Sequence, residues 1–125
     1  MKLFTIKEAN EMIRVVRPIL GEIRSIYKSI DLFRKESIAA SNSAQLGGGG
    51  MKSGSQYVNS LFKLGENTAK LDEIGIQIKD YDRGLIDFPS ERDGEIVLLC
   101  WQLGEGDEIE WWHEIESGFA GRKRI

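Results

Sequence analysis

The chain has 125 residues, of which 41% are hydrophobic and 30% are charged, and its formal net charge is −3. These values are typical of one globular domain, here residues 1–125, and they exclude wholesale disorder and a strongly basic nucleic-acid module. Because Cys100 is the only cysteine, a disulfide scaffold and a four-cysteine zinc module are excluded as well.

The sequence predicts a cytoplasmic protein that does not contact a membrane. No apolar signal segment follows Met1, and the longest uncharged apolar run, residues 96–101, is far shorter than the ~20 residues of a membrane-spanning helix. A single cysteine without a partner in the chain fits a reducing compartment.

Residues 1–73 are expected to form an antiparallel helical hairpin. Thr5 and Glu8 have the spacing of a capping box, in which each side chain bonds the backbone N–H of the other residue. Behind them, apolar residues recur at intervals of three and four, which predicts a long helix packed along its length against another helix. These apolar positions are Ala9, Met12, Val16, Ile19, Ile23, Ile26, Ile30 and Phe33. A Gly-rich loop at 41–55 and a second amphipathic helix at 56–73 complete the hairpin.

The opposite face of the first helix is basic. Its cations are Lys7, Arg14, Arg17, Arg24, Lys28 and Lys35. Such a stripe is suited to nucleic-acid phosphates or to an acidic partner. It is also the usual appearance of a solvated helix face, and the lack of interleaved aromatic residues favours this simpler interpretation.

Residues 74–125 change to the two-residue period of β-strands. We expect strands at 74–79, 85–88, 96–103 and 108–116, with Pro89 ending the second strand and a tight turn at Asp93-Gly94. The run at 96–103 is apolar on both faces, so it is expected to be central, with the helices over one face of the sheet. The predicted fold class is therefore α+β: an N-terminal antiparallel helical hairpin followed by a small, mostly antiparallel sheet of three or four strands.

Two parts of the chain resemble a known family. The first is residues 4–10 (Phe-Thr-Ile-Lys-Glu-Ala-Asn) with Arg-Pro-Ile-Leu at 17–20. The second is stronger: Asp-Arg-Gly-Leu-Ile-Asp-Phe-Pro at 82–89, then Leu-Cys-Trp at 99–101, Trp-His-Glu at 112–114 and Gly-Phe-Ala-Gly-Arg at 118–122. Over about residues 4–30 and 71–122 the chain resembles domain-of-unknown-function family 2203. The resemblance implies a shared fold and no particular substrate, cofactor or mechanism.

The C-terminal part also contains residue types from which binding sites are built. His113 falls on an apolar strand face, and neighbouring strands could bring Asp87 or Trp101 beside it, where a carboxylate-held imidazole is a usable acid or base. Arginines in turns and in the tail suit a phosphate or carboxylate ligand. A packed, hydrogen-bonded histidine and arginines paired with adjacent aspartates are the alternatives. The ligand-binding candidates are Arg83, Asp87, Arg92, Trp101, His113, Glu114 and Arg122.

No catalytic residue, cofactor or metal ligand is assigned from the sequence. A metal site would need His113 together with groups such as Asp87, Glu114 or Cys100, and one histidine without a second His or Cys at ligand spacing does not support it. Cys100 lies in the most apolar run, which favours a buried and inert thiol.

Three functions are compatible with these patterns. The preferred one is a non-catalytic protein-interaction or oligomerisation module, which binds another copy or a different protein through its heptad helices. The first alternative is a small-ligand (anion) binding protein or small enzyme with a site around His113. The second is a weak nucleic-acid binder that uses the basic stripe and the tail at 122–124.

Overall fold

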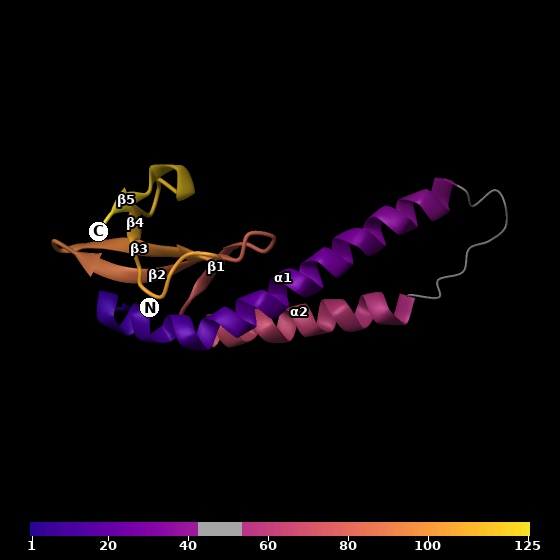
Figure 1. Cartoon of the computed structure of the whole chain (residues 1–125), viewed down its shortest axis with the longest axis horizontal. Coiled ribbons are helices and arrows are strands. Elements are labelled where there is room, and N and C mark those ends of the chain that lie inside the picture. The colour runs from indigo at the N-terminus through magenta and orange to yellow at the C-terminus, as the bar shows by residue number, and fades with distance from the viewer. Residues whose placement is uncertain (43–53) are drawn as a thin grey trace.

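The computed structural model describes residues 1–42 and 54–125. They form two packed helices followed by an antiparallel sheet, so the predicted α+β fold with an N-terminal helical hairpin is confirmed (Figure 1). The helices are α1 (Ile6–Asn42) and α2 (Gly54–Ile74). Most of the predicted loop at 41–55 lies outside the described residues, and its two ends belong to the helices. Within the described ranges, no helix has an apolar stretch long enough to cross a membrane.

Helix α1 begins where the capping box predicts. The Thr5 N–H donates to Oε1 of Glu8 at 2.9 Å, and the Glu8 N–H donates to Oγ1 of Thr5 at 3.0 Å. The buried stripe behind this cap consists of Ala9, Ile13, Val16, Leu20, Ile23 and Ile30, while the predicted positions Met12 and Ile19 lie at its border. The stripe packs against α2 and the sheet, so its spacing serves the core of this chain.

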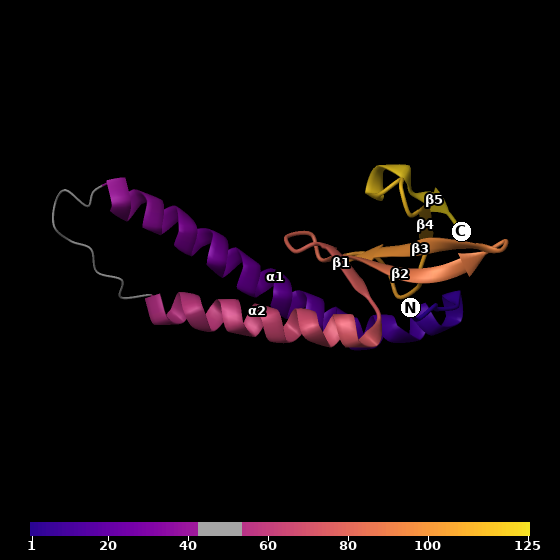
Figure 2. The same cartoon turned by 180° about the vertical axis from the view of Figure 1, so that it is seen from behind.

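The far end of the hairpin extends beyond the sheet. Figures 1 and 2 show α1 and α2 diverging from each other toward the ends that lead into residues 43–53. Phe33 of α1 stacks on Tyr57 of α2 there, with ring centroids 4.3 Å apart. The hairpin is therefore an arm whose outer surfaces the sheet does not cover.

Helix α2 ends at a glycine, which corrects the predicted start of the first strand at residue 74. Gly75 adopts φ 98°, and its N–H donates to the Asp72 carbonyl at 3.0 Å, while the Ile76 N–H donates to the Leu71 carbonyl at 2.9 Å. This pair of bonds is the Schellman motif, which stops a helix by satisfying its last carbonyls and needs a residue that tolerates positive φ. Ile74 is thus helical, and the strand begins three residues later.

The sheet has five antiparallel strands in sequence order, one more than the upper end of the prediction. They are β1 (Gln77–Asp80), β2 (Leu85–Arg92), β3 (Glu95–Gln102), β4 (Trp111–Glu114) and β5 (Lys123–Arg124). Strand β3 is central, as its apolar sequence predicts, and the turn between β2 and β3 is formed by Asp93 and Gly94, both with positive φ. The predicted strand at 108–116 is shorter, and β5 was not predicted.

Strand β2 continues through Pro89, contrary to the prediction that the proline ends it. The Pro89 carbonyl accepts the Phe4 N–H at 2.7 Å, so the backbone of this residue faces the N-terminal segment rather than β3. A strand residue directs its N and its O to the same side, so the missing N–H of Pro89 costs no bond of the β2–β3 ladder.

The sheet separates two layers of unequal size. On one face, Ile86 and Phe88 of β2 and Leu99 and Trp101 of β3 form the main core with α1 (Figure 1). The other face lies under the C-terminal segment, which includes a short 3-10 helix, η2 (Phe119–Gly121) (Figure 2). Because side chains alternate along a strand, every second residue of β2, β3 and β4 points toward this thinner layer.

Candidate functional site

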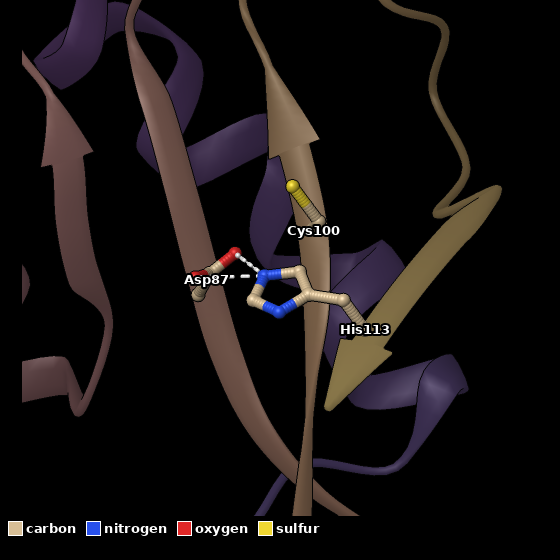
Figure 3. Close-up of side chains that lie close together, drawn as sticks. All are labelled: Asp87, Cys100 and His113. Carbon is tan, nitrogen blue, oxygen red and sulfur yellow. Dashed lines mark hydrogen bonds and ion pairs between the residues drawn. The ribbon is translucent and has the colours of Figure 1, made fainter. Parts of the chain in front are cut away.

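Three neighbouring strands bring Asp87, Cys100 and His113 together on the face that turns away from the helices. Asp87 of β2 pairs with Cys100 of β3, and His113 of β4 pairs with Leu98, two residues before Cys100 on the same face. The imidazole reaches across β3 toward the carboxylate, with the sulfur beside them (Figure 3). One potential ligand atom from each residue lies within 4.8 Å of the other two, and all three residues are buried.

Hydrogen bonds fix the orientation of the His113 ring. Its Nδ1 lies 2.7 Å from the backbone carbonyl of Glu114, which only accepts, so Nδ1 carries a hydrogen. Its Nε2 lies 3.2 and 3.1 Å from the two carboxylate oxygens of Asp87. The Glu114 carbonyl and the Asp87 carboxylate thus hold the ring from its two sides. The pair is buried, since the side chains of His113 and Asp87 are only 3% and 2% exposed.

Cys100 is held as a thiol. Burial raises the pKa of Cys100 from 9.0 to about 12, and the negative charge of Asp87 adds to the shift. Neither His113 nitrogen is free to take the thiol proton, because Nε2 faces Asp87 and Nδ1 faces the Glu114 carbonyl. The cluster therefore lacks the thiol–imidazole contact that activates a cysteine nucleophile.

The C-terminal segment covers this cluster with an arginine. Arg122 lies between two rings, 4.9 Å from the centroid of Trp111 and 4.7 Å from that of Phe119. Its Nη2 donates to Glu105 at 2.7 Å, and the two side chains are 10% and 18% exposed. Arg83 packs on Phe119 from the turn after β1, at 4.1 Å. Because Arg122 is paired with Glu105, its charge is already neutralised.

A small cavity adjoins the cluster. Its volume is about 140 Å³, enough for a few water molecules, each of which occupies about 30 Å³ in the liquid. The residues that line it are Lys79, Leu85, Asp87, Leu98, His113, Ile115, Gly118 and Phe119. Asp87 and His113 thus form part of the wall of this cavity.

The seven ligand-binding candidates from the sequence do not line one cavity. Asp87 and His113 meet, and Arg83 and Arg122 lie in the covering layer. The register of the strands directs the other three to the helix-facing side of the sheet: Arg92, Trp101 and Glu114.

The three residues on the helix-facing side have partners of their own. The Trp101 indole donates to the Gly106 carbonyl at 2.9 Å, and Arg92 packs 4.6 Å from the Trp112 ring. Glu114 bonds to Lys123 and to Ser117, and these bonds, the one from Lys123 first, lower the pKa of Glu114 to about 2. Cys100, a member of the cluster, and Glu105, the partner of Arg122, were not among the candidates, because one lies in an apolar run and the other in a predicted turn.

A second candidate site is an apolar stripe on the solvent side of α2. We call Val58, Phe62, Gly65 and Ala69 the outer seam of α2; their spacing of four, three and four places them on one helix face. Val58 is 64% exposed and Phe62 is 66% exposed. Among residues 1–42 and 54–125, no atom lies within 4 Å of the position that a Cβ on Gly65 would occupy. The opposite face of α2, with Asn67 and Leu71, is buried in the hairpin.

Comparison with known proteins identifies a family. The family model described as "Uncharacterized conserved protein (DUF2203)" matches residues 2–125, which confirms the resemblance and extends it across the middle of the chain. No curated protein and no solved structure matches the chain.

Proposed function

The chain belongs to the DUF2203 family of uncharacterised conserved proteins, and we propose that it is a self-associating module whose second copy docks on the outer seam of α2. The observation that carries the proposal is a heptad-spaced apolar face of α2 that the described residues leave uncovered, with Val58 and Phe62 about two-thirds exposed. Stripes of this spacing are typical of helices that pack along another helix, and isolated exposed apolar residues are not arranged in this way.

The heptad stripe of α1 no longer supports this function. Ile23 and Ile30 are 0% and 2% exposed, since α1 packs along α2 and Ile23 also belongs to the main core with the sheet. A charge placed at Ile23 would therefore unfold the monomer rather than dissociate a dimer. Of the two helices to which the sequence assigns the interaction, α2 therefore offers the exposed surface, its outer seam.

The outer seam is suited to a second copy of itself. Phe62 offers a large side chain and Gly65, one turn later, offers a gap, so a two-fold axis across the seam would seat each Phe62 near the Gly65 of the other copy. Small residues such as Gly65 and Ala69 also allow two helix backbones to approach closely. Helix α2 carries two lysines and three acidic residues, so two copies repel each other little.

The proposal is tested by the molar mass in solution. We expect light scattering after size exclusion to give a dimer mass for the wild-type chain, and Phe62→Glu to shift it to the monomer with unchanged circular dichroism. Leu32→Glu is the matched control, because Leu32 is 58% exposed on α1 and lies off the seam, so it should leave the dimer intact. A monomeric wild type at 100 μM, or equal effects of the two variants, contradicts the proposal.

Substitutions at two glycines distinguish an effect on dimer formation from an effect on the stability of the monomer. Gly65→Gln and Gly21→Gln should each stabilise the helix by up to about 1 kcal/mol, since glycine is a poor helix former and both positions have free space. Only Gly65→Gln fills the seam, so it alone should weaken the dimer. If both variants leave the dimer unchanged, the seam is not the interface.

The other functions remain predictions. Arg17 pairs with Asp107 at 2.8 Å and Lys35 with Asp31 at 3.1 Å, so two of the six cations of the basic stripe are already neutralised. This weakens the support for nucleic-acid binding. A cytoplasmic location is part of the proposal, since the single buried thiol needs no oxidising compartment.

A further inference from the structure

We propose that Asp87, Cys100 and His113 form a binding site for a divalent transition-metal ion, and that Zn²⁺ is the ion that fits it best. The proposal is independent of self-association, since the cluster lies on the outer face of the sheet and the seam lies on α2. It rests on four features: the positions of the donor atoms, the orientation of the histidine, the charge of the buried site and the cavity next to it.

The donor atoms already converge. Nε2 of His113 is 3.1 Å from Oδ2 of Asp87, and one donor atom of each residue lies within 4.8 Å of the others. In a tetrahedral zinc site, with bonds of about 2.0–2.3 Å, ligand atoms are roughly 3.3–3.7 Å apart. Small side-chain rotations on three rigid strands are therefore sufficient to bring sulfur, nitrogen and oxygen to metal-binding distances.

The histidine is oriented as a metal ligand. The Nδ1–H of His113 donates to the Glu114 carbonyl at 2.7 Å, which fixes the ring and directs Nε2 at Asp87. Metal-bound histidines almost always donate their second N–H to a carbonyl or carboxylate in this way, because that bond fixes the tautomer and raises the basicity of the ligating nitrogen. The backbone of β4 thus supplies the outer support of the site.

The charge of the buried cluster matches a divalent ion. When Sγ of Cys100 binds the ion as a thiolate, its proton passes to water, and the thiolate and the Asp87 carboxylate then balance the two positive charges of M²⁺. A low-dielectric interior favours such a neutral site, whereas a monovalent or trivalent ion leaves an unbalanced buried charge.

The donor types select the metal. A thiolate with an imidazole and one carboxylate suits zinc and similar ions, whereas magnesium and calcium prefer sites made of oxygen atoms. The cavity of about 140 Å³ reaches Asp87 and His113, so water or another small ligand can occupy the fourth position. Three protein ligands and an exchangeable fourth coordination position are characteristic of catalytic zinc sites, whereas structural zinc sites have four protein ligands.

Cobalt titration of the full chain tests the proposal. After removal of bound metal with a chelator, we expect one equivalent of Co²⁺ to give a sulfur-to-cobalt charge-transfer band and the visible bands of four-coordinate cobalt. Zn²⁺ should displace it in a one-to-one ratio. Cys100→Ser should abolish the charge-transfer band and weaken Zn²⁺ binding at least about tenfold. His113→Gln should weaken binding to a similar extent.

Glu114→Gln is the matched control. Its carboxylate is adjacent in sequence to His113 but bonds to Lys123 and Ser117, so this variant should bind Co²⁺ like the wild type. Circular dichroism establishes that each variant is folded. If His113→Gln does not fold, Cys100→Ser decides alone, since it changes a single atom. The proposal is wrong if the folded wild type gives no charge-transfer band, or if Cys100→Ser binds Zn²⁺ as tightly as the wild type.

Discussion

The two faces of the sheet are buried in different ways. The face toward α1 is covered by a long helix and packs apolar side chains such as Phe88 and Leu99. On the outer face, the thin C-terminal layer covers Asp87, Cys100 and His113, and these are the buried ionisable side chains among the described residues. A buried ion pair rarely stabilises a fold more than apolar residues of the same volume would. The outer face is therefore better explained by binding than by stability.

Removing one half of the ion pair should produce the largest effect. Asp87→Ala leaves the imidazole of His113 buried without its acceptor, and we expect it to lower the free energy of unfolding by about 3–5 kcal/mol. Urea denaturation followed by circular dichroism measures this loss. The double variant Asp87→Leu/His113→Leu should recover most of it, because it removes both charges and keeps the volume. A double variant as unstable as the single one would show that the pair stabilises the outer face.

Substitution of two adjacent leucines of β3 compares how tightly the two faces of the sheet are packed. Leu99 packs in the main core and Leu98 lines the outer cavity, and they are 2% and 4% exposed. Leu99→Ala should cost about 3–4 kcal/mol, whereas Leu98→Ala should cost about 2 kcal/mol, because it enlarges a cavity that already exists instead of opening a new one in the core. Denaturant midpoints of the two variants test this difference. Equal losses would mean that the outer face is packed as tightly as the core.

The outer face should also make the stability depend on pH. Since the pKa of Cys100 is raised to about 12 in the folded chain, the thiol favours folding fully below pH 9, and this contribution is lost as the pH rises toward 12. The denaturation midpoint of the wild type should therefore fall relative to that of Cys100→Ala between pH 9 and pH 11. If the denaturation midpoints of the two proteins change in parallel over this range, the pKa of Cys100 is not raised by burial.

Local patterns in the sequence predicted most of the fold. The capping box at Thr5 and Glu8 and the turn at Asp93-Gly94 depend on neighbouring residues, and both form as expected. The features that were predicted wrongly or missed depend on residues far away in the sequence. Strand β2 passes through Pro89 because Phe4 bonds to it from the other end of the chain, and β5 is two residues long, too short for any periodicity.

The candidate site was predicted only in part for the same reason. Alternation along one strand indicates which residues share a face, but only the register between strands shows that Asp87 pairs with Cys100. Trp101 was expected beside His113, although it is the neighbour of Cys100 and must therefore point to the opposite face. With the register known, the convergence of carboxylate, thiol and imidazole follows directly from the sequence.

The strands at the two edges of the sheet have a consequence for aggregation. Exposed edges act as templates for strand addition, and proteins limit this with short strands, irregular register and positive charge. Here β1 has four residues with a shifted register between Ile78 and Asp80, and β5 consists of Lys123 and Arg124 alone. Neither edge offers a long, flat ladder to another chain. Copies that meet at high concentration are therefore directed away from β-type fibres, and their helices remain the surfaces available for ordered contact.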